Sequence, residues 1–135
     1  MKPFDYYRDL PDVMRPTEVT AEFEAILSNP NFPCFPQEAA AVLGELSERQ
    51  WNTYTLLDTG VRGAVESLLE KIWRDDDAVL AESLFAVAGR LGLPSFLSFV
   101  GQRRVAQMSS AVQAVVAECV AELQESIADP YSGLR

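Results

Sequence analysis

Apolar residues recur every three or four positions along most of this chain, which is the spacing of one face of an α-helix. The clearest stripe covers residues 61–73, and a second covers residues 77–91, just before Gly92, a residue suited to a helix C-terminus. No segment shows the strict alternation of a half-buried strand between turn residues. The pattern predicts an all-α protein of six or seven helices, with Leu69 and Trp73 of the first stripe buried in its core.

Prolines and capping residues divide the remaining stretches into further helices. Thr17 is predicted to cap a first helix, which ends before Pro30 because the residue before a proline resists the helical conformation. Pro36 suits the first turn of a second helix. Ser47 and Gln50 have the spacing of a capping box and therefore predict the start of a third helix.

In the C-terminal part, residues 93–100 predict a short helix with proline in its first turn, and a long apolar stripe follows. That stripe predicts one helix over about residues 102–128, stopped by an Asp-Pro pair. The expected organisation is an N-terminal arm (1–16), one helical domain (17–129) and a short tail (130–135).

Residues 61–100 combine an apolar helix, an aspartate-rich turn at Asp75 to Asp77 and a second helix that closes on "AGRLG". In this they resemble one unit of a HEAT-type helical repeat, although Ala81 stands where arginine is frequent and Leu84 where alanine is frequent. No second unit recurs at this period on either side. The resemblance implies antiparallel helix pairs and a scaffold that binds other proteins rather than an enzyme.

Three consecutive aspartates, Asp75, Asp76 and Asp77, raise the question of a metal site. Counted from Asp75, an EF-hand loop needs glycine sixth and glutamate twelfth, but the chain has Leu80 and Ala86 there. Carboxylates at a helix N-terminus accept hydrogen bonds from its free N–H groups and offset its dipole. We therefore expect helix capping and no specific metal, with partner binding by these aspartates as the alternative.

Charge narrows the choice of partner. Eleven basic residues against 20 acidic ones give a net charge of −9, which disfavours binding to nucleic acid or to an anionic membrane. The excess suits a basic protein partner, or serves solubility alone. No apolar run is long enough to span a membrane and no signal-peptide pattern opens the chain, so a cytoplasmic location is expected. Cys34 and Cys119 follow no metal-ligand spacing, and we expect reduced thiols; a disulfide or a reactive Cys34 stays open.

The chain contains no histidine. This removes the usual general base, the usual zinc ligand and the partner of a Ser-His or Cys-His pair. A protein that is not an enzyme and needs no cofactor is therefore favoured.

Acidic residues in the last predicted helix are spaced by four, three and four positions, which stacks them on one face. No lysine or arginine follows Arg104 before the last residue, and Arg103 and Arg104 fall near the start of that predicted helix. This is the reverse of what the helix dipole favours. We interpret the face as a surface for a basic protein, with a merely solvated face or acid–base chemistry as alternatives. Its residues are Glu118, Glu122, Glu125 and Asp129.

The leading hypothesis is a small acidic module that neutralises or chaperones a partner protein, as an immunity protein or inhibitor does. One alternative is a structural subunit in which the last helix, or the third helix, pairs two copies. Another is an enzyme or small-ligand carrier with an apolar pocket and Asp58 as a polar contact. The pocket candidates are Phe32, Phe35, Trp51, Tyr54 and Trp73.

Overall fold

The computed structural model describes residues 2–33, 35–124 and 127, and within them every regular element is a helix. The prediction of an all-α fold is therefore confirmed. The elements are α1 (Phe4–Arg8), α2 (Pro16–Leu27), α3 (Pro36–Trp51), α4 (Thr59–Ile72), α5 (Ala78–Leu91), α6 (Pro94–Gly101), the 3-10 helix η1 (Val105–Gln107) and α7 (Ser110–Leu123). None of these helices has both the length and the apolar character needed to cross a membrane.

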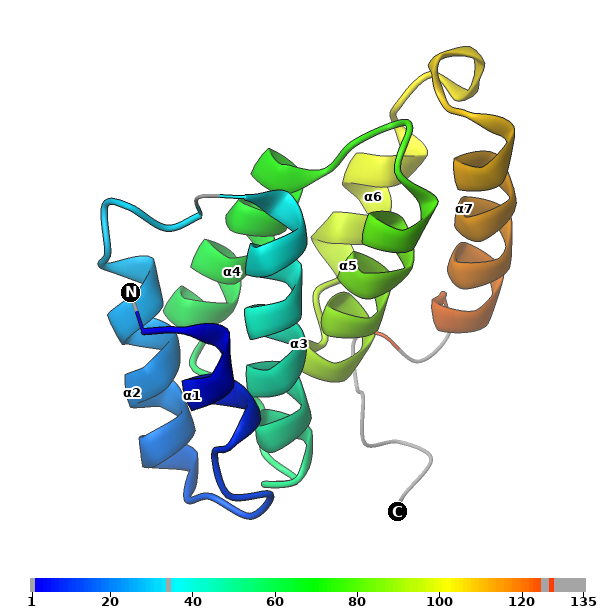
Figure 1. Ribbon diagram of the computed structural model, residues 1–135. Coiled ribbons are helices and arrows are strands. Elements are labelled where there is room, and N and C mark those ends of the chain that lie inside the picture. Colours follow the sequence, from blue (N-terminus) through cyan, green and yellow to red (C-terminus); the bar gives the residue numbers. More distant parts are fainter. Residues whose placement is uncertain (1, 34, 125–126, 128–135) are drawn as a thin grey trace.

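Alternate helices form two layers: α2, α4 and α6 in one, and α3, α5 and α7 in the other (Figure 1). The helices of the second layer run parallel to one another, and hydrogen bonds join the segments at their N-terminal ends. Gln37 at the start of α3 donates to Asp77 before α5 (2.9 Å), and the Ser109 amide before α7 donates to the Asp75 carbonyl (2.9 Å). Stacked helix pairs are the plan of helical-repeat proteins. The resemblance of residues 61–100 to a HEAT unit stays a prediction.

The core contains the stripe of α4. Leu69 and Trp73 are both buried, which confirms the prediction for these two residues. The Trp73 ring meets the rings of Phe85 and Phe96 edge-on, at centroid distances of 6.0 and 5.9 Å. Edge-on packing of aromatic rings is the favoured arrangement and adds to the gain from burial. These rings fasten α4, α5 and α6 together.

The ends of α4 and α5 follow local capping chemistry. The Asp58 carboxylate accepts from the Gly60 amide at the start of α4, and the Asp77 carboxylate accepts from the Leu80 amide at the start of α5, both at 2.9 Å. Gly92 ends α5 with a φ of 71°, a left-handed conformation that costs glycine little. The sequence predicted the ends of α5 closely.

The predicted cap at Thr17 is wrong. The helix α2 begins at Pro16, and Arg15, two residues before Thr17, occupies the N-cap position. A proline in the first turn has no N–H that needs a partner. The Glu18 carboxylate accepts from the Arg15 amide at 3.1 Å, so the third residue of the helix bonds back to the backbone of the N-cap residue.

The predicted helix start at Ser47 is also wrong, because α3 continues unbroken to Trp51. The Ser47 hydroxyl donates to the Gly44 carbonyl one turn earlier (2.9 Å) instead of capping. The Gln50 amide reaches forward to the Thr55 carbonyl (2.6 Å). Ser47, Arg49 and Gln50 are buried in this segment, and tertiary packing overrides the local capping pattern.

The single long helix predicted over residues 102–128 is interrupted. A loop and η1 precede α7, which starts only at Ser110 with the Ser109 hydroxyl accepting from the Val112 amide (3.2 Å). Arg103 and Arg104 therefore lie before α7 and not in it.

The N-terminal arm includes α1 and is tied to α3 by a buried arginine. Arg49 is 4% exposed, and its guanidinium donates to the carbonyls of Arg8 (2.9 Å) and Leu10 (2.8 Å). It also pairs with Glu45 one turn earlier in α3. The arm is therefore packed on the helical domain, and Tyr7 of α1 is buried against it.

Candidate functional site

An acidic face lies on two neighbouring helices of the second layer. Glu118 and Glu122 are exposed on α7, as expected, and Glu82 of α5 is exposed close to them. Burial, and then these three carboxylates, raise the pKa of the half-buried Cys119 thiol. All three carboxylates therefore lie within electrostatic range of this thiol, and the raised pKa favours its protonated form. We call Glu82, Glu118 and Glu122 the acidic face.

Sequence reasoning missed Glu82 because no pattern in the chain shows which helix lies beside α7. Its exposed position on α5 is visible in the spacing, but the parallel packing of α5 and α7 is a tertiary feature. Glu125 and Asp129, the other two members of the predicted face, lie outside the described residues. Cys34 lies outside them as well.

The charges of α7 still oppose its dipole, although its start has moved. The helix contains no lysine or arginine, and Glu118 and Glu122 lie in its C-terminal half. Acidic groups there meet the negative end of the dipole, and their i, i+4 spacing adds a repulsion of a few tenths of a kcal/mol. The stability of α7 therefore does not explain these glutamates.

Asp75 belongs to a clasp between two turns. Arg103 donates to it from Nε and Nη2, both at 2.7 Å, and Trp73 donates from Nε1 at 2.8 Å. The hydrogen bond from Arg103 is the main cause that lowers the pKa of Asp75. With the bond from the Ser109 amide to the Asp75 carbonyl, the clasp joins the α4–α5 turn to the loop before α7.

The other two aspartates differ in exposure and in use. Asp77 caps α5 and accepts from Gln37, and its pKa is lowered chiefly by the Leu80 amide. Asp76 is exposed. The residues that the structure describes include no group of three or more His, Cys, Asp or Glu arranged to hold a metal. Two of the three carboxylates therefore serve the fold. For Asp76, partner binding stays a prediction.

The five aromatic residues predicted as an alternative pocket do not meet in one cavity. Trp73 is buried in the aromatic core, whereas Phe35 and Tyr54 are exposed. Trp51 is half-buried at the end of α3. Phe32 lines a cavity of about 350 Å³ between α2 and α4 without the other four. Asp58, the expected polar contact, caps α4.

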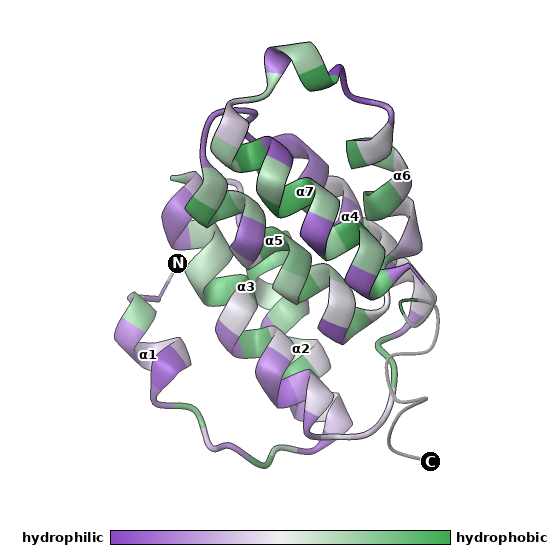
Figure 2. Ribbon diagram, turned by 90° about the vertical axis from the view of Figure 1, so that its right-hand side faces the viewer, coloured by the Kyte–Doolittle hydropathy of each residue, from purple (hydrophilic) through white to green (hydrophobic). Residues whose placement is uncertain are grey.

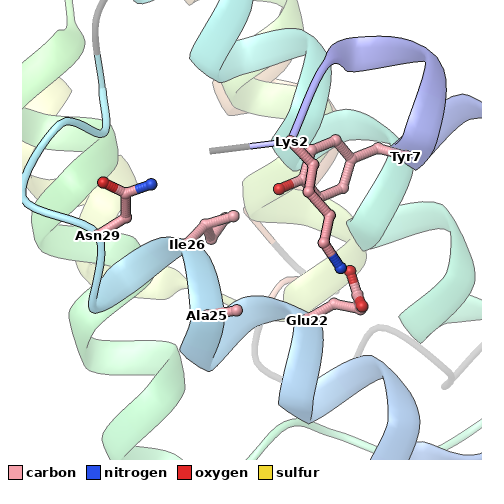
Figure 3. Close-up of a pocket in the computed structure, with 6 residues that line it drawn as sticks. All are labelled: Lys2, Tyr7, Glu22, Ala25, Ile26 and Asn29. Atoms are coloured by element: carbon pink, nitrogen blue, oxygen red, sulfur yellow. The ribbon is translucent and has the colours of Figure 1, made fainter.

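A second cavity, of about 370 Å³, lies between α1 and α2 (Figure 3). The Lys2 side chain extends toward Glu22, and the Lys2 ammonium lies 4.0 Å from the centre of the Tyr6 ring. A hydrogen bond with Tyr6 raises the pKa of Lys2, and burial raises the pKa of Tyr7. Both shifts move the pKa of the group further above 7, so neither group suits proton transfer near pH 7.

No family model, no curated protein and no solved structure matches this chain. What the protein does must therefore be inferred from its own geometry.

Proposed function

We propose that this protein is a small binding module whose acidic face binds a basic region of a partner protein. The observation that carries the proposal is the position of Glu82, Glu118 and Glu122. They are exposed on two adjacent parallel helices, and α7 supplies no cation of its own to balance them.

Physical chemistry favours a partner as the reason for this arrangement. Like charges along α7 and at the wrong end of its dipole work against the helix, so their benefit lies outside it. A partner with complementary charge associates faster and is distinguished from wrong partners. The net charge of −9 adds a long-range attraction for a basic partner. An inhibitor or immunity protein that covers a basic toxin or nuclease is a concrete form of such a module.

Binding is favoured over catalysis by the groups that are missing from the chain and by those in its cavities. Histidine is absent from the sequence. At the N-terminal cavity, the pKa values of Lys2 and Tyr7 are raised further above 7. The acidic face consists of carboxylates, which attract cations, beside a thiol whose pKa is raised. The cytoplasmic location expected from the sequence stays a prediction.

The proposal is tested by capturing basic partners from the native cell and then measuring the association rate of one purified partner. Glu82→Gln, Glu118→Gln and Glu122→Gln are combined as the face variant. We expect the face variant to associate more slowly than wild type, and the wild-type rate to fall as salt screens exposed charges over a range of about 10 Å at 0.1 M.

A matched control removes the same charge elsewhere. Asp9→Asn, Glu24→Gln and Glu70→Gln lie on or beside α1, α2 and α4, away from the acidic face. If binding depends on the acidic face, this control variant should keep an association rate close to that of wild type. Equal rates for wild type and the face variant at low salt, or equal losses in both variants, contradict the proposal.

A further inference from the structure

An apolar cleft of about 330 Å³ lies between α6 and α7, on the side of α7 away from Glu118 and Glu122. Its floor includes the buried Val100 and Met108, and its walls include Val105, Val116 and Ala117. Val105 is 62% exposed, so its side chain is accessible from solvent at the edge of the cleft. We call this feature the α6–α7 cleft.

Two polar side chains at the edge of the α6–α7 cleft, Gln113 and Arg103, make hydrogen bonds within the protein. The Gln113 amide donates to the carbonyls of Val105 and Met108, both at 3.0 Å, which holds η1 against α7. Arg103 is fixed by its two bonds to Asp75. The cleft is therefore preformed, and what it offers to an occupant is mainly apolar surface.

Between the cleft and the acidic face, α7 presents only small side chains. Ala114, Ala117 and Ala121 are exposed and spaced by three and four positions, which places them on one side of the helix. Figure 2 views the molecule from this end, and no described helix covers α7 there. Methyl side chains allow another helix to approach the backbone of α7 closely.

The charges around α7 specify the direction of such a helix. Glu118 and Glu122 lie toward its C-terminal end, and the exposed Arg104 lies in the loop before its start. A helix lying antiparallel to α7 places its positive N-terminal end near the glutamates and its negative C-terminal end near Arg104. The arrangement that opposes the dipole of α7 therefore complements the dipole of an antiparallel neighbour.

We infer that the α6–α7 cleft and the alanine side of α7 bind an amphipathic helix of the partner, antiparallel to α7, with basic residues in its N-terminal half and an apolar side chain in the cleft. This inference rests on the proposed function and names the part of the partner that the acidic face meets. A helix laid in an apolar groove is a common mode of peptide recognition.

A second copy of this chain fits the same surface less well. Each copy has a net charge of −9, so two copies repel one another as they approach. A basic helix instead gains from that field at every distance within the range of screening.

Two synthetic peptides of about 18 residues, five helical turns long, test the inference. They have the same composition and the same leucine stripe, but one has its lysines in the N-terminal half and the other in the C-terminal half. Side-chain lactam bridges make their helicity equal. Calorimetry should show the first peptide binding wild type about tenfold more tightly than the second.

Matched protein variants test where the peptide binds. Val105→Asp introduces a charge in the cleft, and we expect it to weaken binding of the first peptide about tenfold or more, because burying an unpaired carboxylate is costly. Val13→Asp introduces the same charge at a valine that is 80% exposed between α1 and α2, and should leave binding unchanged. As a control, circular dichroism should show that both variants remain helical.

Four results overturn the inference: no binding of either peptide, equal binding of the two, equal losses in the two variants, or sedimentation showing a dimer that Val105→Asp dissociates. The proposed function fails separately. If Glu118→Gln with Glu122→Gln slows binding of the natural partner while Val105→Asp does not, the acidic face stands without the cleft. If neither change slows binding of that partner, both proposals fail.

Discussion

At the α3 end of the helical stack, the N-terminal arm packs over the outermost helix of the layer, whereas at the other end α7 faces solvent. Arg49 and Asn52 of the α3 end donate to backbone carbonyls of the arm, including the Asp12 carbonyl at 2.9 Å. The outward side of α7 carries alanines and an unbalanced acidic face, and no described helix packs on it. One end is closed by polar groups that bond to the arm, whereas the other leaves Glu118 and Glu122 exposed.

This difference separates two uses of charge. Arg49 is buried and almost fully engaged, so it reports on how the fold is held together. Glu118 and Glu122 are exposed, and their charges are unfavourable with the dipole of α7, so the stability of the fold does not account for them. Substitutions at the two ends should therefore have opposite consequences for stability.

A truncation in the core between the two ends should have the largest effect. Leu69 is fully buried, and Leu69→Ala removes its contacts and leaves a cavity, which should lower the free energy of unfolding by about 2–5 kcal/mol. Urea denaturation followed by circular dichroism measures the change. An unchanged midpoint would mean that the stripe of α4 faces solvent.

Breaking the closed end should cost somewhat less. Arg49→Met keeps much of the side-chain volume but leaves the carbonyls of Arg8 and Leu10 without their donor and Glu45 without its partner. We expect a loss of about 3 kcal/mol in the free energy of unfolding and faster proteolysis of the arm. If Arg49→Met is as stable as wild type, the arm is not held by these bonds.

Opening the clasp near α7 should have a smaller effect that depends on pH. Asp75→Asn weakens the bonds from Arg103 and should cost about 1–2 kcal/mol at pH 7. The pKa of Asp75 is lowered in the folded state, so its contribution is complete above its unfolded pKa of about 3.9 and is lost as the pH falls through the folded value. The stabilities of wild type and variant should therefore converge in acid.

The control for this clasp is Asp76→Asn. Asp76 is exposed in the same turn, and the change removes the same charge, so it should have little effect on stability. Denaturation curves at pH 7 and along an acid series compare the two variants. A constant difference between wild type and Asp75→Asn over the whole series would show that its carboxylate does not titrate as described.

Neutralising the two glutamates of α7 should have the smallest effect on stability, and it should raise stability instead of lowering it. Glu118→Gln with Glu122→Gln relieves repulsion along α7 and its conflict with the dipole. We expect the free energy of unfolding to rise by a few tenths of a kcal/mol, measured as a shift of the urea midpoint at low salt. A clear loss of stability would show that the glutamates serve the fold after all.

The helices that the sequence predicted well are those whose ends depend on neighbours in the chain. Asp77 and Gly92 mark α5 because capping and the left-handed turn are local chemistry. The stripe of residues 61–73 identified the buried side of α4 for the same reason. Ser47 failed because its hydroxyl found a partner inside a helix that distant packing keeps intact.

The site was harder to predict than the fold because its parts meet only in three dimensions. The clasp joins Asp75 to Arg103 across 28 positions, and this interaction keeps Arg103 outside the helix that spacing alone would extend to it. The spacing of Val105 and Met108 fits a helical stripe, yet both line a cleft instead. The acidic residues of α7 were visible in the sequence, but their neighbour Glu82 was not.

The position of α7 at the edge of its layer also bears on the order of opening and folding. It packs chiefly on α5, whereas α5 has neighbours on both sides. In stacked helical units, stability accumulates between nearest neighbours, so the terminal helix opens at a lower free energy than the interior ones. The amide hydrogens of α7 should thus exchange with solvent before those of α5, and slower exchange on binding would report occupancy of this end directly.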